Sequence, residues 1–335
     1  MYILIVLWLL VCYKIFYRGK LLQLIIAILP VFLMLAFRGE TVGKDTMNYL
    51  SAYSAIHHSV TLQELFETID FEKGYLVLCF LLKKGGFEEQ ALLITESFIF
   101  CASIVCFCKD NAKDKMFMLI VSVLSLFGFA SSGIRQTIAI SVFLFAYRYA
   151  RESKWIIYIL LALLAVSFHT SAILAFPFAL LINRKFSFST AIFYLILLII
   201  SIISMSTIFS VVSTMLNYDE YQLMTLDGGY FSFAISVLVS ILAIVKYKDE
   251  RNNISFQQSS HYTFVYMILS AIRFVNVMVM RVVLYFSVFP FLLIDSLQKG
   301  KWNVQIKFFA LCFVVIYFIY SMSSSDNYMF YWETI

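Results

Sequence analysis

Long apolar blocks separated by short polar segments are the feature that most limits how this chain can fold. Many of the blocks approach the ~20 residues that an α-helix needs to cross a ~30 Å hydrocarbon core. Hydrophobic residues make up 62% of the chain and charged residues only 13%, whereas soluble domains contain ~45–50% apolar and ~25% charged residues. We therefore predict an all-α, polytopic bundle of transmembrane helices that forms a single integral membrane domain over residues 1–335.

The apolar blocks predict about twelve spans, and ten to twelve are compatible with their lengths because several blocks are short. The stretch 168–181 is either a span or a re-entrant segment. The predicted spans are 2–17, 21–37, 88–108, 116–131, 135–150, 154–168, 170–182, 188–211, 229–246, 258–275, 279–297 and 303–321.

The positive charges predict the orientation of these spans. Most of the 25 Lys and Arg residues fall in alternate loops, such as 109–115, 148–154 and 246–251, and the positive-inside rule places those loops in the cytoplasm and both termini outside. The apolar stretch 74–84 is too short to cross, so we expect an interfacial or re-entrant helix on the outer side. It closes a long extracytoplasmic loop over 38–87, and a second such loop covers 212–228.

Several function classes lack their sequence signatures. Membrane topology accounts for the basic residues, so no nucleic-acid partner is expected. All six cysteines lie in apolar segments and the four histidines lack ligand spacing, so we predict no disulfide, metal or cofactor. The chain has no P-loop, GxGxxG, GxSxG or DxD pattern, which argues against ATPases, Rossmann enzymes, serine hydrolases and metal-dependent nucleotide-sugar transferases.

Arginines at the outer ends of the spans are candidates for anion binding. Arg135 opens a nearly chargeless helix, where an arginine is costly unless it snorkels, pairs or meets an anion. Its planar guanidinium suits a phosphate or pyrophosphate. Arg273 and Arg281, with Asn276 between them, lie on roughly one side of a helix. Together with Arg135 they would form a clamp for an anion. Arg38 is a further candidate. The alternative for Arg273, Arg281 and Arg38 is ion pairing with Asp45, Glu72 or Glu96, and that for Arg135 is a snorkelling or structurally paired side chain.

Other polar residues at these ends are candidates for proton transfer and sugar binding. His169 is a possible general base or sugar contact, or an interfacial histidine without a catalytic role. Asp45 and Glu72 are the best carboxylate candidates for a base, or else counter-charges of the arginines. Tyr49 and Tyr75 are candidates for stacking on sugar rings, or else residues of the interfacial aromatic belt.

These segments resemble the EpsG family of bacterial membrane proteins, a branch of the Wzy-type polysaccharide polymerases. The resemblance extends over nearly the whole chain. It rests on Arg38 with Gly43, Asp45, Asn48 and Tyr49; on Glu72, Gly74 and Tyr75; on Gly133, Arg135, Gln136 and Ala139; on Phe168, His169, Ser171 and Pro177; on the segment from Asn217 to Tyr221; and on Asn276, Arg281, Tyr285 and Tyr328.

The resemblance implies a GT-C-like membrane glycosyltransferase in the bacterial inner membrane. Such an enzyme polymerises undecaprenyl-pyrophosphate-linked repeat units on the extracytoplasmic face, for O-antigen, capsule or exopolysaccharide. It also implies membrane lipids, a chain-length regulator and a flippase as partners. The alternatives are a transporter or flippase of lipid-linked sugars, and a membrane acyltransferase with His169 as its base.

The resemblance and the chemistry together suggest roles for individual residues. We expect a metal-independent reaction in which His169 or Asp45 activates the acceptor hydroxyl. Residues expected to bind the pyrophosphate and glycan are Arg135, Arg281, Arg38, Arg273, Gln136, Asn276, Glu72, Tyr49 and Tyr75.

Overall fold

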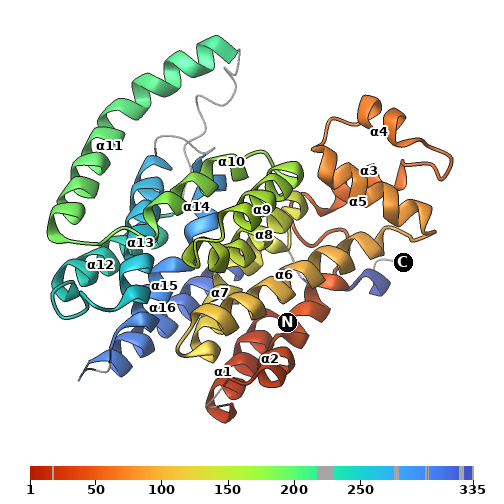
Figure 1. Cartoon of the computed structure of the whole chain (residues 1–335). Coiled ribbons are helices and arrows are strands. Elements are labelled where there is room, and N and C mark those ends of the chain that lie inside the picture. The colour runs from red at the N-terminus through yellow and green to blue at the C-terminus, as the bar shows by residue number, and fades with distance from the viewer. Residues whose placement is uncertain are drawn as a thin grey trace. The chain divides into compact units, whose positions relative to one another are not determined.

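The computed structural model describes residues 1–16, 19–216, 229–274, 279–298, 300, 302–323 and 328–333, with side chains of 205–216 left aside. Throughout these ranges the secondary structure is helical, apart from one antiparallel bridge between Arg38 and Phe330 (Figure 1). This confirms the predicted all-α class for the described part of the chain. The chain forms two compact units, Met1–Phe176 with Leu311–Ile335, and Pro177–Ala310.

Apolar helices form the body of the first unit, and each falls on a predicted span. Central among them is α8, which packs against α6, α9 and the short α10. Most of α7 is buried as well, which explains why nearly all of its residues are apolar. The helices are α1 (Tyr2–Ile15), α2 (Leu21–Ala36), α6 (Gln90–Asn111), α7 (Lys115–Ala130), α8 (Ile134–Arg151), α9 (Trp155–Phe168), α10 (Ala172–Ala175) and the last part of α16 (Asn303–Ser323).

Three short helices lie between α2 and α6 in sequence: α3 (Thr46–Ser54), α4 (Leu62–Thr68) and α5 (Lys73–Lys84). Figure 1 shows them grouped beside the start of α6. A reciprocal capping box between Thr61 and Glu64 begins α4. With 12 residues, α5 is only about 18 Å long, too short to cross a bilayer. A short helix was predicted here, and its buried face packs into the cluster that includes Leu92 and Leu93.

The second unit is built around α13. This helix (Ile254–Ile272) packs against α11 (Phe188–Leu216), α12 (Tyr230–Lys246), α14 (Val279–Phe286) and α15 (Phe289–Ser296). The predicted span 279–297 consists of α14 and α15, with Pro290 in the first turn of α15, where its missing N–H costs nothing. The predicted loop 212–228 is helical to residue 216 and otherwise lies outside the described residues.

Within the described residues, three helical stretches have the length and apolar composition to cross a membrane: Gln90–Asn111, Val279–Ser296 and Asn303–Ser323. Several shorter apolar helices accompany them, including α1, α2, α7, α9 and α12. The chain is therefore a helical membrane protein, and the number of crossings stays a prediction. The stretch Ala172–Leu181 combines α10 with a 3-10 turn and is too short to span alone.

The basic loops of the first unit meet at one end of its helices. Arg148 Nη1 lies 2.7 Å from Asp110 Oδ2, and Arg151 Nη1 donates to Asn111 Oδ1 at 2.5 Å. These contacts join the last turns of α6 and α8. Since α8 runs from Ile134 to Arg151, Arg135 lies at the opposite end of the same helix.

Candidate functional site

One carboxylate, that of Glu72, joins three separate elements of the first unit. Glu72 directly precedes α5, and its Oε2 forms an ion pair with Nη1 of Arg135 in the first turn of α8. Its Oε1 lies 2.8 Å from Nδ1 of His169, directly after α9, and accepts the backbone N–H of Thr170 at 3.2 Å. We call Glu72, Arg135 and His169 the Glu72 cluster.

The hydrogen bond to Glu72 determines what the imidazole of His169 can do. An ionised carboxylate only accepts hydrogen bonds, so Nδ1 of His169 carries a proton and Nε2 is the acceptor in the neutral ring. Nε2 is buried and has no hydrogen-bond partner in the described part of the structure. A carboxylate on one imidazole nitrogen and a second nitrogen that makes no hydrogen bond in the described structure is the arrangement that a general base requires.

The environment of Glu72 keeps its carboxyl ionised. Burial by itself raises the pKa of Glu72, but the hydrogen bond with His169, the charge of Arg135 and the N–H of Thr170 outweigh this effect and lower the pKa to about 2. At neutral pH the site therefore contains a fixed anion between Arg135 and His169.

Aromatic rings hold the guanidinium of Arg135. Its Cζ lies 4.2 Å from the ring centre of Phe71 and 5.6 Å from that of Tyr49, and its Nε donates to the Tyr49 hydroxyl at 3.3 Å. Tyr75 packs against both rings, with centroids 5.6 and 5.9 Å away. The Arg135 side chain keeps 21% of its surface exposed, so it is oriented by cation–π contacts and still accessible to a ligand.

Tyr49 and Tyr75, predicted as candidates for stacking on sugar rings, lie buried around Arg135 with 9% and 1% exposure. In this structure they support the arginine and present no open ring face. Phe71 was not singled out from the sequence, although it directly precedes Glu72.

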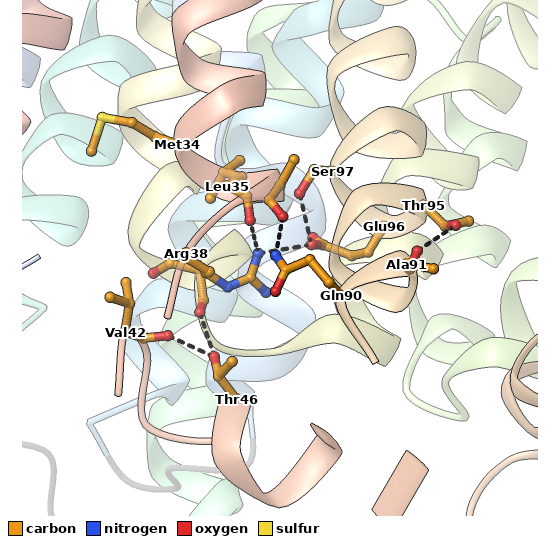
Figure 2. A network of polar contacts seen from close by, with 12 residues as sticks. Met34, Leu35, Arg38, Val42, Thr46, Gln90, Ala91, Thr95, Glu96 and Ser97 are labelled. Atoms are coloured by element: carbon orange, nitrogen blue, oxygen red, sulfur yellow. Dashed lines mark hydrogen bonds and ion pairs between the residues drawn. The ribbon is translucent and has the colours of Figure 1, made fainter. Parts of the chain in front are cut away.

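Arg38 lies in a separate, fully buried ion pair at the end of α2. Figure 2 shows its Nη1 donating to the Leu35 carbonyl at 2.5 Å and lying 3.3 Å from Glu96 Oε2. Both side chains have no exposed surface. Nε and Nη2 of Arg38 and Oε1 of Glu96 have no hydrogen-bond partner among the described atoms. For Arg38, the structure therefore has the ion pair that we gave as the alternative to anion binding.

Residues 328–333 bond to the backbone around this arginine. The Gly39 N–H donates to the Met329 carbonyl at 2.8 Å, and the Tyr331 N–H donates to the Phe37 carbonyl at 3.1 Å. The Tyr328 hydroxyl also donates to the Met34 carbonyl at 2.5 Å. These bonds and the bridge at Arg38 connect the segment to the end of α2.

The remaining candidates of the first unit lie beside the Glu72 cluster and do not belong to it. Asp45 is exposed at the start of α3, and its backbone N–H donates to Ser132 Oγ at 3.2 Å. Gln136 follows Arg135 but is buried within α8. Among the described residues, no group of three His, Cys, Asp or Glu side chains is arranged to hold a metal ion.

The second unit contains the other predicted arginines. Arg273 Nη1 donates to Ser232 Oγ at 3.2 Å, and its guanidinium lies against Gly229. Arg281 is exposed on α14. Asn276 lies outside the described residues. A clamp that combines Arg135 with Arg273 and Arg281 stays a prediction.

Comparison with known proteins gives one family match. The model of the EpsG family matches residues 21–333, a range that includes the whole Glu72 cluster. No curated protein and no solved structure gives a significant match.

Proposed function

Since this chain belongs to the EpsG family of polysaccharide polymerase-like membrane proteins, we propose that it is a lipid-pyrophosphate-dependent glycosyltransferase. It would polymerise undecaprenyl-pyrophosphate-linked oligosaccharide repeat units. The observation that carries the proposal is the Glu72 cluster, because it places a potential general base and a partly exposed arginine on the same carboxylate.

The cluster supports a single displacement at the anomeric carbon. His169 Nε2 takes the proton of an acceptor hydroxyl, and the hydroxyl oxygen forms the new bond to the anomeric carbon of the donor glycan. The bond from that carbon to the pyrophosphate oxygen breaks, and the lipid pyrophosphate leaves with the electron pair. Arg135 stabilises the leaving charge with its planar guanidinium. Glu72 keeps the imidazole and the guanidinium in place for both events.

We place this reaction on the extracytoplasmic side of the inner membrane, in a GT-C-like architecture. The proposal is supported by the two ends of α8, which carry Arg135 at one end and Arg148 and Arg151 at the other. The positive-inside rule puts the end with Arg148 and Arg151 in the cytoplasm.

The test uses purified protein in liposomes supplied with lipid-linked repeat units and no nucleotide or acyl donor. Polymer should form with the unsubstituted chain and fall at least about a hundredfold in Arg135→Ala, Arg135→Lys and His169→Asn, since each removes a transition-state contact. The matched control is Arg148→Ala, which removes an arginine at the other end of α8 and should retain polymerisation.

Three other outcomes would contradict the proposal. Full-length polymer from both Arg135 variants would show that the guanidinium does not stabilise the leaving pyrophosphate. Movement of the lipid-linked unit across the liposome membrane without elongation would indicate a flippase. A strict requirement for an acyl donor would indicate an acyltransferase.

A further inference from the structure

Two glycines lie where the segment 38–87 touches the helices that carry the Glu72 cluster. Gly43 faces the backbone of Ser131, in the turn between α7 and α8. A Cβ at Gly43 would lie 2.7 Å from the Ser131 carbonyl carbon and closer still to its oxygen. The backbone of Gly43 also has φ +91°, a conformation that side-chain-bearing residues rarely adopt.

Gly74 makes the equivalent approach to α9. It is the second residue of α5, and a Cβ there would lie 2.7 Å from the Ser167 carbonyl oxygen and 2.8 Å from its carbonyl carbon. Ser167 is followed by Phe168, the last residue of α9, and then by His169. The Ser167 hydroxyl lies closer still to this Cβ, but because two backbone atoms of Ser167 also obstruct it, rotation of the side chain alone cannot make room for a methyl group.

Each close approach is accompanied by hydrogen bonds at the same place. Next to Gly43, the Thr46 hydroxyl donates to the Ser131 carbonyl at 3.0 Å, and the Asp45 N–H donates to Ser132 Oγ at 3.2 Å. Next to Gly74, Glu72 accepts from Thr170. Each contact also lies near a residue of the site in sequence: Gly43 begins the turn into α3, which carries Tyr49, and Gly74 follows Glu72.

We propose that Gly43 and Gly74 are positioning residues of the site, because their lack of a side chain lets the segment 38–87 approach closely enough to hold Tyr49 on Arg135 and Glu72 on His169. The inference rests on the proposed function for its catalytic consequence. The docking itself rests on the contacts alone.

The expected consequence of a methyl group at either position is a displacement of the segment. A Cβ closer than 3.0 Å to backbone atoms forces a shift of several tenths of an ångström or more, and a misplacement of about 1 Å costs about a hundredfold in rate. The shift at Gly74 would move Glu72 away from His169, so it should lower kcat and leave KM for the lipid-linked acceptor within about twofold of its original value.

Two glycines of the same unit offer matched controls. Gly128→Ala also adds a methyl group inside a helix, but its Cβ would meet only the flexible end of Met322, at 2.8 Å. Gly86→Ala places a side chain on a backbone of positive φ (+77°), as Gly43→Ala does, but no atom lies within 4 Å of the added Cβ. Gly74→Ala is compared with Gly128→Ala, and Gly43→Ala with Gly86→Ala. We expect about a hundredfold lower kcat in the first member of each pair and control values within about threefold.

A labelling experiment measures the docking without catalysis. Ser131 is only 7% exposed beneath the segment. In purified protein that carries Ser131→Cys, a maleimide should react slowly in combination with Gly86→Ala and many times faster in combination with Gly43→Ala. The same preparations without Ser131→Cys measure the background from the six native cysteines.

The two experiments separate this inference from the proposed function. Control-level kcat in both Gly43→Ala and Gly74→Ala, with equally slow labelling in the Gly43 pair, would overturn the positioning role and leave the polymerase proposal intact. Absence of polymer from the unsubstituted protein would overturn the proposed function, and the labelling comparison would still decide whether Gly43 docks the segment.

Discussion

Replacing Glu72 by glutamine tests the centre of the site with the smallest change of shape. An amide presents one oxygen and one NH₂ group, whereas the Glu72 carboxylate accepts from His169 and Thr170 on one oxygen and from Arg135 on the other. The NH₂ group of Gln would therefore face the donors of His169 and Thr170, or else the donor of Arg135. Either the imidazole or the guanidinium loses its partner.

The lowered pKa of Glu72 sets how much stability the substitution should cost. Its fall from the usual range to about 2 corresponds to about 3 kcal/mol in favour of the folded state at neutral pH, at ~1.4 kcal/mol per pH unit. Because the folded-state pKa is lowered, this stability is fully present above the unfolded pKa of ~4.3. It is lost as the pH falls toward 2.

The assay is reversible unfolding of the purified protein in mixed micelles, followed across that pH range. Glu72→Gln should be less stable than the unsubstituted protein by about 3 kcal/mol near pH 7, and the difference should shrink toward zero near pH 2. Polymerisation should fall about a hundredfold. The control is Glu40→Gln, an exposed carboxylate of the same segment. Equal stability of Glu72→Gln and the unsubstituted protein near pH 7 would refute the reasoning, as would a difference that persists unchanged near pH 2.

Three further predictions concern ion pairs and hydrogen bonds outside the site, and unfolding in mixed micelles measures each. Glu96→Ala should cost about 3–5 kcal/mol because it leaves Arg38 buried without a counter-charge, and the joint change Arg38→Met with Glu96→Leu should recover most of that loss; no recovery would contradict the explanation. Asp110→Asn, in a partly exposed pair, should cost less than about 1 kcal/mol, and a larger loss would show that the pair matters more than its exposure suggests. Tyr328→Phe should cost about 1 kcal/mol through the hydrogen bond to Met34, and an unchanged stability would argue against that bond.

The helices could be predicted from the sequence because the apolar blocks and the breaks between them are local properties. The structure has a helix within each predicted span of the first unit, and a short helix at the predicted 74–84 stretch. A lone apolar stretch can also be recognised as too short to cross from its length alone.

The partners of the charged residues could not be predicted in the same way. Glu72 lies 63 positions from Arg135 and 97 from His169, and the sequence offers Asp45, Glu72 and Glu96 as equivalent counter-charges. Arg38 and Arg135 also look alike in sequence, since each lies at the end of an apolar block. The structure distinguishes them by burial, with no exposure of the Arg38 side chain and 21% exposure of the Arg135 side chain.

The attachment of residues 328–333 to the end of α2 has a consequence for the order in which the protein is assembled. The hydrogen bond from Tyr328 to Met34 joins residues 294 positions apart. A ribosome therefore delivers α2 and α6, with both charges of the Arg38–Glu96 pair, long before the residues that bond to the end of α2. Until residues 328–333 emerge, the newly inserted end of α2 lacks these hydrogen bonds, and the first unit can be completed only after nearly all of this sequence has been synthesised.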